Sequence, residues 1–350
     1  MKVLKFGGTS VGSAQRIKEV AKLITDGERK IVVLSAMSGT TNTLVEISDY
    51  LYKKNPEGAN EIINKLESKY RQHIDELFAT PEYKQKGLEL IKSHFDYIRS
   101  YTKDLFTLFE EKVVLAQGEL ISTAMMNYYL QECGVKSVLL PALEYMRTDK
   151  NAEPDPVYIK DKLQVQLELH PDAEIYITQG YICRNAYGEI DNLQRGGSDY
   201  TASLIGAAIN ASEIQIWTDI DGMHNNDPRI VDKTAPVRHL HFEEAAELAY
   251  FGAKILHPTC IQPAKYANIP VRLLNTMDPT APGTLISNDT EKGKIKAVAA
   301  KDNITAIKIK SSRMLLAHGF LRKVFEIFES YQTSIDMICT SEVGVSVSID

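Results

Sequence analysis

Hydrophobic positions follow two different spacings along the chain. Residues 2–6 and 30–34 are short apolar runs, and each leads into a turn of small residues followed by apolar positions three or four residues apart. A repeat of strand, turn and helix predicts an α/β fold with a mainly parallel sheet. The same pattern predicts further strands near 136–140, 174–178 and 213–218, and helices over 119–131 and 198–210.

Residues 55–112 interrupt this alternation. Their composition shifts to Lys, Glu, Tyr and Leu, prolines occur only at Pro56 and Pro81, and apolar residues recur at helical spacing. We interpret the segment as a helical insertion. The sheet is then assembled from strands on both sides of it.

A second change of pattern lies near residue 280. Pro279, Pro282, Gly283 and Thr284, followed by the polar stretch 287–294, have the composition of an exposed inter-domain linker. We therefore expect a catalytic domain over residues 1–290 and a second domain over residues 296–350.

The second domain has the predicted order βαββ. The expected elements are a strand at 304–310, a helix at 315–331, and strands at 334–340 and 343–349. A βαββαβ unit that lacks its last helix and strand leaves an apolar sheet face uncovered. We therefore expect the chain to be a fragment of a longer polypeptide.

Composition narrows the class of protein. The 350 residues carry a net charge of -6, which is no cationic footprint for nucleic acid or an anionic membrane. The longest apolar runs are too short to span a bilayer, and no signal-peptide pattern opens the chain. The four cysteines lie far apart with no zinc-like spacing, and the histidines form no metal frame. A soluble, cytoplasmic protein with a small-molecule substrate and no bound metal of its own is expected.

The first turn combines Lys5 with Gly7 and Gly8 between a strand and a helix. Backbone N–H groups at such a turn, together with the helix dipole, favour a phosphate. The alternative is a plain glycine turn, but a lysine just before it favours the phosphate site. The turn is not a Walker A loop, and no G-x-G-x-x-G frame occurs anywhere.

Two later turns also carry candidate chemistry. Arg195, Ser198 and Asp199 flank a glycine pair at a helix start, where arginine offers a planar fork for a carboxylate and the other two are natural caps. Thr218 and Asp219 follow an apolar strand, at the sheet edge where open α/β folds bind ligands. A loop with a helix cap is the alternative for the first of these turns, and the second lacks the ligand spacing of an EF-hand calcium loop.

Three further residues are ambiguous when taken alone. Arg229 and Lys254 could neutralise a polyphosphate, or could be solvated surface cations. Glu119 reads as an ordinary acid in the first turn of the helix that follows the insertion.

The segments KFGGTSVG, SAMSGTTN, QGE, RGGSDYTA, WTDIDG, DPR and FGAKILHP occur in this order along the chain. Together they resemble aspartokinases of the amino acid kinase family. The resemblance implies a three-layer α/β/α kinase domain that uses ATP with Mg2+ to phosphorylate L-aspartate, followed by a partial ACT regulatory domain. The first step of lysine, threonine and methionine biosynthesis would then be its reaction, and oligomers would form through ACT domains.

The resemblance also assigns roles to residues. Phosphate contacts are implied for Lys5, Gly7 and Gly8, and aspartate contacts for Thr41, Glu119, Arg195 and Ser198. Asp199 would organise the reacting end. Nucleotide contacts are implied for Thr218, Asp219, Arg229 and Lys254, together with His224, which stands where lysine-sensitive relatives have tyrosine. Gln194 departs from the glycine found in many relatives.

Residues 314–321 and 335–342 resemble the effector-binding part of lysine-sensitive aspartokinases. Lysine is therefore the favoured effector, with threonine as the alternative. The implied effector residues are Met314, Phe320, Leu321, Ile335, Asp336, Thr340, Ser341 and Glu342.

The implied mechanism needs no strong base, because an aspartate carboxylate with a pKa of about 3.9 is already ionised at neutral pH. Positioning and charge neutralisation must supply the catalysis. Glu119 would pair with the substrate ammonium and Arg195 with its α-carboxylate. Another amino acid kinase, or an inactive lysine-binding sensor, remains the alternative function.

Overall fold

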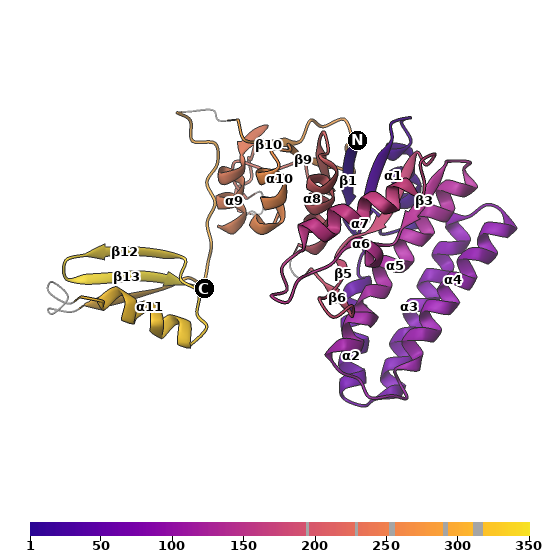
Figure 1. Cartoon of the computed structure of the whole chain (residues 1–350), viewed down its shortest axis with the longest axis horizontal. Helices are drawn as coiled ribbons and strands as arrows, with labels where there is room; N and C mark the ends of the chain where they lie inside the picture. The colour runs from indigo at the N-terminus through magenta and orange to yellow at the C-terminus, as the bar shows by residue number, and fades with distance from the viewer. Residues whose placement is uncertain (194–195, 228–229, 252–255, 290–292, 311–317) are drawn as a thin grey trace. The chain divides into compact units, whose positions relative to one another are not determined.

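The computed structural model describes residues 1–193, 196–227, 230–251, 256–289, 293–310 and 318–350. The chain divides into two compact units, Met1–Val298 and Ala299–Asp350, and each is described by itself (Figure 1). No helix of the described residues is both long and apolar enough to cross a membrane.

An eight-stranded sheet forms the centre of the first unit. Its strand order is β3-β4-β2-β1-β7-β9-β10-β8, parallel from β3 to β9, with β10 antiparallel to β9 and β8 parallel to β10. The strands are β1 Lys2–Phe6, β2 Lys30–Leu34, β3 Ser137–Leu140, β4 Ile175–Gln179, β7 Ile214–Thr218, β8 His239–His241, β9 Val271–Asn275 and β10 Thr284–Ser287. The predicted α/β class and mainly parallel sheet are confirmed.

Helices cover both faces of this sheet, because its central strands are apolar on both sides. On β1, Leu4 and Phe6 join one buried core, whereas Val3 joins the other. The first core is covered by α1 Ala14–Ile24, α2 Thr40–Tyr52, α3 Pro56–Leu77, α4 Pro81–Ser100 and α5 Leu108–Glu132. The second is covered by α6 Ala142–Tyr145, α7 Pro156–Glu168, α8 Gly197–Ile209, α9 Phe242–Tyr250, the 3-10 helix η1 Pro258–Ile261 and α10 Gln262–Tyr266. The three-layer architecture follows.

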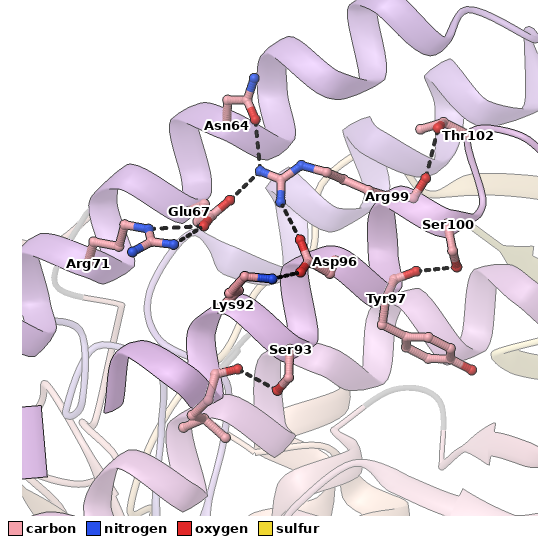
Figure 2. A network of polar contacts seen from close by, with 11 residues as sticks. Asn64, Glu67, Arg71, Lys92, Ser93, Asp96, Tyr97, Arg99, Ser100 and Thr102 are labelled. Carbon is pink, nitrogen blue, oxygen red and sulfur yellow. Dashed lines mark hydrogen bonds and ion pairs between the residues drawn. The ribbon is translucent and has the colours of Figure 1, made fainter. Parts of the chain in front are cut away.

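The insertion consists of α3, α4 and the first turns of α5, which lie side by side in Figure 1. Polar contacts tie α3 to α4: Arg99 binds Glu67 and also donates to Asn64 at 2.8 Å (Figure 2). Arg71 completes the network with two bonds to Glu67, at 2.9 and 2.7 Å.

One predicted helix boundary is wrong. We expected a helix to begin at Glu119, but α5 begins at Leu108, and Glu119 lies in its interior. Thr107 and Glu110 form a capping box, in which each side chain bonds the backbone of the other, and this fixes the true start. Glu119 is therefore no first-turn acid, and its charge is not explained by the helix dipole.

The predicted linker also contains a strand. Thr284–Ser287 forms β10 between β9 and β8, and Thr284 and Ile286 are fully buried. The surrounding proline and glycine made this four-residue strand resemble part of the linker. A short hairpin, β5 Ile182–Arg184 and β6 Ile190–Asn192, was not predicted either.

The second unit is a three-stranded antiparallel sheet with one helix. Its strand order is β11-β13-β12, and its elements are β11 Thr305–Lys310, α11 Phe320–Ser330, β12 Met337–Ser341 and β13 Gly344–Ile349. The order βαββ agrees with the sequence pattern. The helix begins at Phe320, after a left-handed Gly319 (φ 80°), rather than at 315, and residues 311–317 lie outside the described part.

Candidate functional site

The carboxyl ends of four parallel strands, β4, β2, β1 and β7, meet at one edge of the sheet. Open α/β sheets bind their ligands at this edge. The turns after β1 and β2 approach closely, because the Ser38 N–H donates to the Gly8 carbonyl at 3.1 Å and the Ser35 N–H to the Phe6 carbonyl at 3.2 Å.

A cavity of about 340 Å³ opens at this edge. It is lined by Lys5, Ser35, Thr41, Glu119, Tyr181, Gly196, Gly197, Ser198 and Asp199. Five residues that the sequence singled out, from four separate segments, thus come together. A neighbouring cavity of about 330 Å³ shares Ser35 and Thr41 and is also lined by Gly8 and Thr9.

Lys5 and Asp199 form an ion pair across the first cavity. Lys5 Nζ lies 2.7 Å from Asp199 Oδ1, and the two side chains are only 11% and 12% exposed. Asp199 sits in the first turn of α8, where the helix dipole favours an anion. The pair holds a cation at the point where the sheet edge, the glycine turn and the start of α8 converge.

Glu119 is the most deeply buried acid of the cavity, at 3% exposure. Its Oε1 accepts the Ala36 N–H at 3.2 Å, whereas its Oε2 has no hydrogen-bond partner among the described residues. Burial raises the pKa of this carboxyl group to about 7, an effect that the backbone hydrogen bond only partly offsets. A carboxylate held in this way favours a cationic ligand group.

Hydroxyl groups line the rest of the wall. Ser35 Oγ donates to Ser198 Oγ at 2.9 Å, which links the turn after β2 to the start of α8. Ser122 Oγ donates to the Ser35 carbonyl at 2.8 Å and holds that turn against α5. Thr41 lies in the first turn of α2, between the two cavities.

The two glycines of the first turn differ in role. A Cβ on Gly8 would lie 2.8 Å from the Ala36 carbonyl oxygen, so only glycine fits between the turns. The Gly7 N–H donates to the Trp217 carbonyl at 3.3 Å, which joins the turn to β7. Gly7 therefore ties the turn to the sheet, whereas Gly8 lets the two turns approach each other.

Neither cavity is lined by the predicted nucleotide residues that the structure describes, which are Thr218, Asp219 and His224. Thr218 ends β7, beside the glycine turn, and Asp219 follows it as an exposed residue. His224 shares a 2.8 Å hydrogen bond with the Thr234 hydroxyl. Arg195, Arg229 and Lys254 lie outside the described residues, so the structure does not place them.

Ser35 and Tyr181 line the cavity but were not predicted as site residues. Tyr181 has a left-handed backbone (φ 69°), fixed by its N–H bond to Thr201 Oγ1 at 3.1 Å and by the Leu193 N–H bond to its carbonyl at 2.8 Å. Ser35 directly follows β2, and Tyr181 comes two residues after β4. The rule that ligands bind at carboxyl ends of strands could have identified both.

The predicted effector residues lie in the second unit. Phe320 and Leu321 begin α11, Ile335 and Asp336 precede β12, Thr340 and Ser341 end it, and Glu342 follows. The Asp336 N–H donates to the Ser348 carbonyl at 2.9 Å. Met314 lies outside the described residues.

Comparison with known proteins places this chain in a family. The sequence profile of the amino acid kinase family matches residues 1–275. Aspartokinase 1, chloroplastic, of Arabidopsis thaliana is 38% identical over 99% of this chain but only 63% of its own length, less than two thirds. The crystal structure of E. coli aspartokinase III in complex with aspartate and ADP has a TM-score of 0.86 at 33% identity, covering 100% of this chain and 78% of that one.

The structure of the same E. coli enzyme in complex with lysine and aspartate has a TM-score of 0.82 at 33% identity, covering 100% of this chain and 79% of that one. The profile covers residues 1–275, and both structures cover the whole chain. The chain belongs to the amino acid kinase family, among its aspartokinases.

Proposed function

We propose that the chain is an aspartate kinase, which transfers the γ-phosphoryl group of ATP to the side-chain carboxylate of L-aspartate and releases ADP and 4-phospho-L-aspartate. The main support for this proposal is the cavity, which is lined both by the Lys5–Asp199 ion pair and by Glu119, a carboxylate with only one oxygen that is hydrogen-bonded within the described part of the chain. Such a cavity suits a small zwitterion with a second carboxylate. The E. coli relative was crystallised with aspartate and ADP.

The proposed acceptor contacts follow from charge. The unpaired Oε2 of Glu119 receives the substrate ammonium, which removes the penalty of its burial. Ser198 and Thr41 offer hydroxyl groups, and Arg195 is assigned to the α-carboxylate. Only the side-chain carboxylate is then free to attack.

The proposed catalysis relies on positioning and charge neutralisation. The attacking carboxylate approaches an anionic phosphate of MgATP, and Lys5 offsets this repulsion, assisted by the Gly8 N–H. Asp199 holds the Lys5 ammonium in place. The metal ion enters as part of the substrate and screens the phosphate charge.

The nucleotide is assigned to the neighbouring edge after β7. Thr218 and Asp219 lie there beside the glycine turn, because the Gly7 N–H bonds the residue that precedes Thr218. Arg229, Lys254 and His224 complete the proposed set. This arrangement leaves the acceptor on the β1–β2–α8 side and the phosphates at the glycine turn.

Turnover is the direct test. The purified chain is incubated with MgATP and L-aspartate, ADP is measured, and the acyl phosphate is trapped with hydroxylamine. L-Glutamate and N-acetyl-L-glutamate serve as matched acceptors, the second because it lacks the ammonium that Glu119 binds. A hydroxamate product that forms with aspartate and with neither of the other two acceptors supports the proposal. Lysine binding without any turnover would instead indicate an inactive sensor.

Lysine is the proposed effector, bound by the second unit, which we assign to a partial ACT domain that joins subunits in oligomers. Its βαββ order and the lysine complex of the E. coli relative support this assignment. Titration of aspartate-dependent turnover with L-lysine and with L-threonine tests it. If threonine inhibits turnover and lysine does not, threonine is the effector instead of lysine.

A further inference from the structure

The helical insertion reaches the candidate site through a buried hydroxyl group. Tyr70 of α3 is 1% exposed, and its hydroxyl oxygen lies 2.8 Å from Oγ1 of Thr40, which is 2% exposed. Thr40 is the first residue of α2, and the next residue, Thr41, lines both cavities. A contact made by the insertion therefore ends one residue from the site.

Thr40 is enclosed on its other side by α5. A Cβ on Gly118 would lie 3.2 Å from the Thr40 methyl carbon and 2.7 Å from the Ala36 Cβ. Gly118 immediately precedes Glu119. Burial raises the pKa of Tyr70, and the charge of Glu119 adds to this rise, in agreement with the two groups lying near each other. Thr40 is thus held between the insertion and the helix that carries Glu119.

The helix that carries Tyr70 is itself firmly anchored. Glu67, one turn earlier, is 8% exposed, and burial alone would raise its pKa, but hydrogen bonds from Arg99 and Arg71 lower it instead (Figure 2). This charged network fixes α3 on α4. The helix α3 also contacts the turn after β2, because Lys69 Nζ donates to the Ser38 carbonyl at 3.4 Å.

We propose that Tyr70 is a positioning residue, whose hydroxyl group holds Thr40, and through it Thr41 and the start of α2, at the wall that binds the acceptor amino acid. This inference rests on the proposed function. The insertion then supports the site and is not an appendage of the fold. If the role of the bond were purely structural, its loss would lower stability without raising the KM for aspartate. A positioning role predicts that the KM for aspartate rises.

The first test is Tyr70→Phe, which removes the hydroxyl group and keeps the ring. The KM for aspartate is expected to rise about tenfold, with smaller changes in kcat and in the KM for ATP. Tyr145→Phe is the matched control, because the Tyr145 hydroxyl shares an equally buried bond with Thr178 Oγ1, at 2.6 Å, on the other face of the sheet. Equal shifts in aspartate KM for both variants, or none for Tyr70→Phe, would overturn the proposal.

The second test adds Thr40→Val to Tyr70→Phe. With both hydroxyl groups gone, no buried polar atom is left unpaired, so the melting temperature should return toward that of the wild type. The aspartate KM should stay high, since the positioning bond is still absent. A KM that recovers together with stability would show that the bond is structural only.

The third test needs no turnover. Backbone amides of residues 36–44 should exchange hydrogen faster in Tyr70→Phe than in the wild type or in Tyr145→Phe. If the wild type does not phosphorylate aspartate, the proposed function fails, yet this comparison still decides whether Tyr70 holds the loop. Unchanged exchange in this segment would refute the positioning role.

Discussion

Lys5 and Asp199 are buried together, so water cannot compensate one charge when the other is removed. Lys5→Met is expected to abolish most aspartate-dependent turnover and to lower the free energy of unfolding by about 3–5 kcal/mol. The double variant Lys5→Met/Asp199→Asn should regain stability without regaining activity. Initial rates and urea denaturation measure the two effects.

Lys30→Met is the matched control for this experiment. Lys30 is also a buried lysine on a central strand and is paired with Asp26, but it lies at the amino end of β2, away from the cavity. Its kcat should equal that of the wild type. A Lys5→Met protein with wild-type kcat would remove Lys5 from the catalytic assignment.

Glu119 makes the stability of the ligand-free protein depend on pH. Burial raises its pKa from 4.5 to about 7, so between these values the folded state keeps a proton that the unfolded state has lost. The free energy of unfolding therefore decreases as pH rises through this window, by on the order of 3 kcal/mol in total. Glu119→Gln should abolish this decrease, since an amide does not titrate.

Urea midpoints of the wild type and Glu119→Gln, measured from about pH 4.5 to roughly pH 7.5, check the expectation. The variant should become progressively more stable than the wild type as pH rises. Parallel curves would mean that the carboxyl group titrates normally. Adding aspartate should reduce the difference, because its ammonium stabilises the charged form of Glu119.

The sequence singled out most of the polar residues that line the first cavity, because Lys5, Glu119, Ser198 and Asp199 stand in recognisable motifs. It did not identify Tyr181, although this residue closely follows the end of β4; its left-handed backbone is imposed only by the surrounding bonds. Nor could it show that Glu119 lacks a second partner. That property arises from packing between segments distant in the sequence.

At the scale of the elements, the turns after β1 and β2 can pack together only because Gly8 has no side chain. Gly8→Ala places a Cβ 2.8 Å from a backbone oxygen, which cannot rotate away, so the turns must separate. We expect the free energy of unfolding to fall by about 1–3 kcal/mol. We also expect kcat to fall, by a factor that corresponds to a larger free energy. Gly7→Ala is the comparison, because its Cβ would meet the flexible end of Lys5 at 3.5 Å and the Trp217 carbonyl oxygen at 3.9 Å, both ordinary contact distances.

Thermal denaturation and initial rates of both glycine variants test this expectation. Gly7→Ala should melt near the wild-type temperature, whereas Gly8→Ala should melt clearly lower. If both variants melt alike, the close approach of the two turns does not constrain the fold.

Strand and helix types were predicted well where apolar spacing is regular, as for β1, β2 and α8. The predictions failed where local signals conflicted with tertiary packing. Gly118 resembled a helix boundary, yet it sits mid-helix because α5 must approach Ala36 closely. Pro282 and Gly283 resembled a linker, yet they lead into β10, which is paired on both edges.

On the scale of the whole molecule, every described cavity residue belongs to the first unit. A variant that ends at Val298 is therefore expected to keep aspartate-dependent turnover, while its response to lysine is lost. Circular dichroism and initial rates with and without L-lysine decide the matter. A folded but inactive variant would show that the second unit contributes to catalysis.

The position of β1 has a consequence for biosynthesis. β1 is synthesised long before one of its two neighbours, because on one side it pairs with β7, where Val3 faces Ile214. At about 5–20 residues per second, roughly 10–40 seconds pass before that partner is made. During this interval a strand apolar on both faces has one open edge, which makes the nascent chain a target for chaperones and prone to aggregation. Slower translation of the α8–β7 region should therefore lower the soluble yield without changing the folded product.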